Sequence, residues 1–65
     1  MQVEAETLEA VGDHFRRARL AARLTQEQVA DLAGISRPRY RDVETGAAAA
    51  RTTTLINIAR ALGLE

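Results

Sequence analysis

The 65-residue chain has no cysteine, no tryptophan and no lysine, a single proline and only two aromatic residues, Phe15 and Tyr40. Without cysteine it can form neither a disulfide nor a thiolate metal site. No apolar run approaches the roughly 20 residues that a membrane-spanning helix needs. One histidine and no visible nucleophile–base pair, phosphate loop or metal cluster make an enzyme improbable. We therefore expect a protein without catalytic residues, cofactor or metal.

The chain is neutral overall, but its charges are segregated along the sequence. Residues 1–13 carry four acidic and no basic residues, whereas residues 14–65 carry nine arginines against five acidic residues. About 46% of the residues are apolar, which favours one small folded domain over disorder. We divide the chain into an acidic N-terminal arm, residues 1–7, and one domain, residues 8–65.

The apolar spacing indicates helices throughout and no strand of any length. Leu8, Val11, Phe15, Ala18 and Ala22 follow one another at spacings of three and four, as on one face of a helix. Three glycines each follow such a pattern, where helices commonly end in a left-handed residue. The sequence predicts helices at residues 8–22, 26–33, 37–45 and 53–62, and hence an all-α domain.

The two middle helices begin with complete capping signals. Thr25 and Gln28 form a capping box before residues 26–33, and Ser36 can cap residues 37–45. Pro38 falls in the first turn of the latter, where a missing N–H costs little. Only three residues, 34–36, separate these two helices. A turn that short, with a glycine in it, predicts a helix-turn-helix corner.

The helix at residues 37–45 begins with three arginines, at 37, 39 and 41. Cations are disfavoured there, because the N-terminal end of a helix carries a partial positive charge. A sequence optimised for stability alone would place acidic residues at this end. A docked anion would relieve the conflict, and the phosphate of DNA is the obvious one.

The stretches GDHFRRAR, LTQEQVADLAGIS, RDVETG and TLINIARALGL, with their spacings, give residues 12–64 a close resemblance to a known family. They resemble the Cro and phage-repressor type of helix-turn-helix, also called the xenobiotic-response-element family. The resemblance implies a lambda-repressor-like bundle of four or five helices that binds operator DNA as a dimer. It also implies that the third helix enters the major groove.

The resemblance assigns roles residue by residue. The base-facing positions of the recognition helix are occupied by Arg37, Pro38, Arg39 and Asp42. Contacts to DNA phosphate are expected from Gln26, Arg41, Tyr40, Arg23 and Arg51. A family salt bridge between the first and third helices corresponds to Arg19 and Glu44.

Three apolar residues stand at positions that are usually polar in the family: Leu20, Leu32 and Ile56. They are candidates for a dimer or partner contact, with Ile56 preferred because that region commonly pairs in the family. His14 is expected to be an exposed helix residue, because the ligands of a metal site are lacking.

Three functions are compatible with the sequence. The first is a transcriptional repressor that binds an inverted-repeat operator as a homodimer in the cytoplasm of a bacterium or its phage, close to the nucleoid. The second is an antitoxin, because RTTTLINIARALGLE resembles the end of the HipB-like bundle; such a protein would bind its operator and also a toxin kinase. The third is a helical adaptor without DNA binding, which would show no salt-dependent binding to any duplex.

Overall fold

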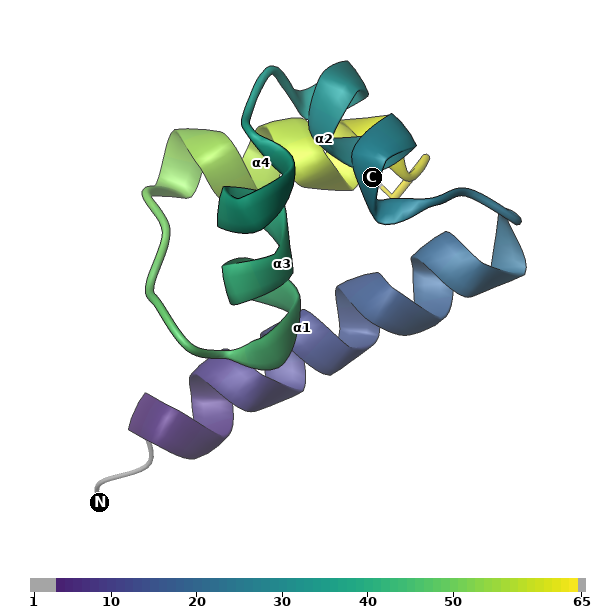
Figure 1. The fold of residues 1–65 in the computed structure, drawn as a ribbon. Helices are drawn as coiled ribbons and strands as arrows, with labels where there is room; N and C mark the ends of the chain where they lie inside the picture. The colour runs from purple at the N-terminus through teal and green to yellow at the C-terminus, as the bar shows by residue number, and fades with distance from the viewer. Residues whose placement is uncertain (1–3, 65) are drawn as a thin grey trace.

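The computed structural model describes the backbone of residues 4–64 and the side chains of residues 7–64. These residues form four helices and no strand: α1 (Glu4–Ala21), α2 (Gln26–Ala33), α3 (Arg37–Thr45) and α4 (Thr52–Ala61). Figure 1 shows α1 crossing the base of the molecule with α3 packed on it, and α2 and α4 above. The all-α prediction is confirmed, and so are the bounds of the two middle helices.

The first and last helices begin earlier than predicted. α1 starts at Glu4 rather than at the predicted residue 8, so residues 4–7 of the acidic arm extend this helix. The rest of that arm lies outside the described residues. α1 also ends at Ala21, which leaves Ala22 exposed and outside the predicted apolar stripe. α4 begins and ends one residue before its predicted bounds.

Local capping interactions explain where α2 and α3 begin and end. The Thr25 hydroxyl accepts from the Gln28 N–H at 3.0 Å, and the Gln28 side chain accepts from the Thr25 N–H at 2.8 Å. The Ser36 hydroxyl accepts from the backbone N–H of the third residue of α3 at 3.2 Å. Gly34 and Gly46 close the two helices at φ angles of 75° and 76°, which glycine adopts without strain.

The core lies between the four helices. Its buried members come from every helix: Phe15, Val29, Ala30, Ala33, Tyr40, Val43 and Ile58. Leu55, Ala59 and Leu62 pack against this cluster. No helix within residues 4–64 is long and apolar enough to cross a lipid bilayer.

α1 and α3 cross at Gly12. A methyl group at this position would collide with the backbone carbonyl oxygens of Val43 and Glu44. The absence of a side chain therefore lets the two helix backbones approach closely. This contact fixes the distance between α1 and α3.

Candidate nucleic-acid interface

The corner between α2 and α3 is tight and has a glycine in its turn. Gly34 takes the left-handed conformation, and the Ile35 N–H donates to the Ala30 carbonyl at 3.0 Å. Ala30 is buried, and Ile35 packs against the core cluster. The corner thus fixes the direction of α3 relative to α2.

α3 has two faces of opposite character. Its inner face, which we define as Tyr40, Val43 and Glu44, is buried against the other helices. Its outer face carries the four residues predicted to face bases, together with Arg41: Arg37, Pro38, Arg39, Arg41 and Asp42. Of these, only Asp42 is partly covered, and its side chain is still 44% exposed. The structure therefore brings these predicted site residues together on one exposed surface.

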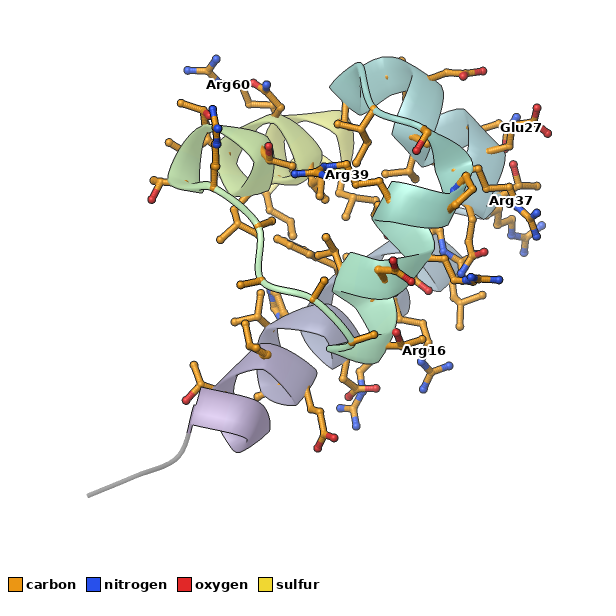
Figure 2. The ribbon with its side chains drawn as sticks, turned by 60° about the vertical axis from the view of Figure 1, so that its left-hand side comes forward. Arg16, Glu27, Arg37, Arg39 and Arg60 are labelled. Atoms are coloured by element: carbon orange, nitrogen blue, oxygen red, sulfur yellow. The ribbon has the colours of Figure 1, made fainter. Side chains whose placement is uncertain are left out.

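Helical geometry arranges the outer face into a middle and two edges. Successive residues turn by about 100° around the axis, which places Pro38 and Asp42 opposite the buried face. Arg37 and Arg41 then lie along one edge, and Arg39 lies along the other. Figure 2 shows Arg37 leaving α3 on the side of Glu27 and Arg39 leaving on the opposite side, toward α4.

The same geometry places Thr45 on the outer face, seven residues after Pro38 and three after Asp42. Thr45 is exposed, and its hydroxyl donates to the Asp42 carbonyl at 3.3 Å. Thr45 was not among the site residues predicted from the sequence. Its spacing from Pro38 and Asp42 was the available signal.

The arginines of the outer face keep their positive charge largely uncompensated. Within residues 7–64, the one acidic group within 4.0 Å of any of their guanidinium groups is Asp42, which lies 3.9 Å from that of Arg41. Arg37 and Arg39 form no salt bridge with any side chain in that range. Both lie in the first turn of α3, where the helix dipole adds to their charge. The surface is therefore suited to bind an anion.

Comparison with known proteins agrees with this geometry. Residues 10–65 match the family described as helix-turn-helix domain. The chain belongs to this family. Its fold is also similar to the crystal structure of the restriction-modification controller protein C.AhdI from Aeromonas hydrophila, with 32% sequence identity and a TM-score of 0.89 over 92% of this chain and 91% of that one. No curated protein sequence matches the chain.

The two matches confirm the predicted helix-turn-helix family and the predicted all-α fold. They identify the chain as a DNA-binding domain of a transcription regulator.

A buried ion pair supports the recognition helix of this helix-turn-helix domain from within. Arg19 of α1 donates to Glu44 of α3 through Nε at 2.5 Å and through Nη2 at 3.2 Å. The Glu44 side chain is only 2% exposed. Arg19 Nη1 also donates to the Leu24 carbonyl at 3.0 Å, and Gln26 Nε2 donates to Glu44 Oε1 at 3.0 Å. The carboxylate therefore links α1, α2 and α3, and the predicted Arg19–Glu44 pair is present.

These contacts hold the pair in its charged form. Burial alone would raise the pKa of Glu44, but the hydrogen bonds from Arg19 and Gln26 and the positive charge of Arg19 outweigh it, and the net pKa is lowered. The hydrogen bond to Glu44 raises the pKa of Arg19. Burial is the main cause of the raised pKa of Tyr40. At neutral pH the ion pair is charged and the phenol is neutral.

The structure contradicts the predicted phosphate contact of Tyr40. The residue is fully buried, and its hydroxyl lies inside the domain near Arg19 and Glu44, so no DNA phosphate can reach it. The resemblance misled here because family members usually carry an aliphatic residue at this position. The longer tyrosine fills the same core site and directs its hydroxyl at the ion pair.

The remaining predicted phosphate contacts lie near the outer face or on neighbouring helix ends. Gln26 is the first residue of α2 and is half-buried, with one of its two amide hydrogens used by Glu44. Arg23 is exposed at the end of α1 and has a φ of 61°, in the left-handed region. Arg51 is exposed at the N-cap of α4 and makes no side-chain capping bond. Arg41 is exposed on α3.

The three candidate partner residues are exposed but lie on three different helices. The exposed fraction is 52% for Leu20 on α1, 64% for Leu32 on α2 and 44% for Ile56 on α4. Leu32 lines an open groove of about 550 Å³ between α2 and α4, whose charged residues are Asp31 and Arg60. The three therefore do not form one patch on a single helix. His14 is exposed, as predicted.

Proposed function

We propose that the protein is a transcriptional repressor that binds double-stranded DNA sequence-specifically as a dimer, with α3 in the major groove. The observation that carries this proposal is the outer face of α3, where three arginines are exposed. Of the two acidic residues of α3, Asp42 lies on this face and Glu44 is turned inward. Arginine is the commonest specific reader of guanine in the major groove. An exposed helix with arginines in its N-terminal turns can enter a DNA groove, because phosphates line that groove.

Two kinds of contact divide the work. Arg37, Pro38, Arg39 and Asp42 read base edges, which gives sequence preference. Gln26, Arg23, Arg41 and Arg51 contact phosphates, which gives affinity and register. The second amide hydrogen of Gln26 remains free for a phosphate while Glu44 holds the first, so the ion pair also orients this contact.

A domain of this size makes few contacts, so the proposed repressor acts as a symmetric dimer on an inverted repeat. The half-sites would lie about one helical turn apart. Ile56 on α4 is the preferred dimer contact, with Leu20 and Leu32 as further candidates. C.AhdI, to which the fold is similar, is named a restriction-modification controller protein, which agrees with a regulator. Neither match points to a toxin kinase as a partner.

Selection of bound duplexes from a random pool tests the proposal. We expect an enriched sequence with two-fold symmetry and binding that weakens as salt rises. The adaptor alternative gives no enriched sequence and no salt-dependent binding to any duplex, which would refute the repressor.

Single arginine substitutions then separate reading from phosphate contact. Arg39→Ala should weaken binding to the selected site by about 1–3 kcal/mol and relax the preference at one base pair. Arg60→Ala is the matched control, because Arg60 is an exposed arginine on α4. An equal loss on selected and random DNA would show that Arg39 holds only a phosphate.

A further inference from the structure

Two carboxylates on α3, Asp42 and Glu44, are held in different ways. Glu44 is buried and accepts hydrogen bonds from Arg19 and Gln26. Asp42 lies in the middle of the outer face with a side chain that is 44% exposed. Its nearest cation is Arg41, at 3.9 Å, which is too long for a hydrogen bond. Asp42 is therefore the one acidic side chain that α3 presents outward.

A carboxylate at this position opposes binding to DNA in general. It lies between arginines on both edges of the helix, on the surface proposed to face the groove, where it adds repulsion toward the phosphates of any sequence. The repulsion is offset only where a base edge offers a hydrogen-bond donor. In the major groove, cytosine and adenine both present an amino donor, but adenine places the N7 acceptor beside it, so aspartate pairs with the amino group of cytosine.

We infer that Asp42 is a specificity-determining residue that weakens binding to all duplexes and recovers the loss only over a cytosine. This inference rests on the proposed function, because it assigns a role within the same interface. It adds that one residue of the surface acts against non-specific DNA. The arginines then supply attraction, and Asp42 raises the ratio between selected and random sites.

Replacing Asp42 with asparagine changes the hydrogen-bonding pattern at nearly constant shape. Asparagine bonds adenine with two hydrogen bonds, so duplexes selected with Asp42→Asn should carry adenine where the wild type selects cytosine. The discrimination between these bases should be about 5- to 140-fold for each protein. Binding to random DNA should strengthen, and its logarithmic salt dependence should steepen by up to about 0.9.

Two controls isolate the role of Asp42. Asp31→Asn makes the same change of charge on an exposed residue of α2, in the groove between α2 and α4. It should leave the selected bases unchanged and should raise the affinity for random DNA less than Asp42→Asn does. Asp42→Asn in an Arg41→Gln background tests whether Asp42 acts only by holding Arg41. The base switch should persist there. Melting curves should show that all variants remain folded, because Asp31 and Arg41 are exposed and Asp42 is only partly covered.

The outcomes separate this inference from the proposed function. If the wild type enriches a sequence and Asp42→Asn enriches the same one, Asp42 reads no base and the inference is wrong. If the switch disappears in the Arg41→Gln background, Asp42 acts through Arg41 and the inference is also wrong. If the wild type enriches nothing, the proposed function itself fails.

Discussion

The inner and outer faces of α3 treat the same kinds of side chain in opposite ways. On the inner face, Glu44 is paired with Arg19 at 2.5 Å and shielded from water. On the outer face, Arg37 and Arg39 are exposed and form no salt bridge within residues 7–64. The inner face thus holds paired charges that stabilise the fold, whereas the outer face holds exposed arginines that can bind an anionic ligand. One short helix can therefore separate stability from recognition, and the following predictions test that separation.

The largest effect should come from breaking the ion pair on the inner face. Glu44→Gln leaves the buried Arg19 guanidinium without its carboxylate, which typically costs about 3–5 kcal/mol. Urea denaturation should show this as a lower midpoint at unchanged slope. Asp42→Asn on the outer face is the matched control and should change the midpoint little. Similar losses in the two variants would contradict the contrast between the faces.

The crossing of α1 and α3 should be nearly as sensitive. In Gly12→Ala the added methyl group meets backbone carbonyl oxygens, which cannot move as a flexible side chain would. The helices must separate, and overpacking of this kind costs about 1–3 kcal/mol. Thermal melting measures the loss. Ala10→Gly, at an exposed position of the same helix, gives the cost of exchanging alanine and glycine alone.

Acid should weaken the inner face specifically. Because the folded state lowers the pKa of Glu44, the pair stabilises the fold at pH above the ordinary carboxyl value of 4.5. That stabilisation is lost as the pH falls through the lowered pKa, where Glu44 takes up a proton. Denaturation midpoints measured from neutral pH into acid should fall less steeply for Glu44→Gln than for the wild type. Parallel curves would show that Glu44 does not titrate in this way.

On the outer face, removing an arginine should raise the stability of the fold and weaken binding to DNA. Arg37→Ala removes a cation from the first turn of α3, so stability should rise by up to about 0.3–1 kcal/mol. Binding to the selected duplex should weaken by about 1–3 kcal/mol. Arg60→Ala makes the same change in the last turn of α4, where the dipole favours cations, and should lower stability slightly. A loss of stability in Arg37→Ala would contradict the dipole argument.

The smallest effect concerns Arg23, whose left-handed conformation is unfavourable for a residue with a Cβ atom. Arg23→Gly should raise stability by about 1 kcal/mol, whereas Arg23→Ala keeps the Cβ and should not. Both variants should bind duplexes more weakly if the guanidinium contacts a phosphate. Equal melting temperatures for the two variants would show that the conformation costs nothing here.

Features set by neighbours in the sequence could be predicted from it. Thr25, Ser36 and the glycines at 34 and 46 fix α2 and α3 through bonds that span a few residues, and both helices have their predicted bounds. The Arg19–Glu44 pair joins residues 25 apart, and it was predicted only through the family resemblance.

The features that were missed depend on three-dimensional surroundings. Tyr40 was expected to reach phosphate because its hydroxyl needs a polar neighbour, but that neighbour is the Arg19–Glu44 pair inside the domain. The bond from Gln26 to Glu44 joins helices whose angle is set by packing. The start of α1 at Glu4 was missed because residues 4–7 carry no large apolar side chain, and Ala5, three residues before Leu8, was not counted in the stripe.

The capping bonds at Thr25 and Ser36 have one more consequence. Because they and the closing glycines are satisfied within the domain, the backbone of the corner has its final shape before any duplex is met. Little backbone entropy is then lost on association, and the remaining ordering concerns the long arginine side chains. Exchanging the outward residues of α3 should therefore transplant a new sequence preference onto the same scaffold without remodelling it.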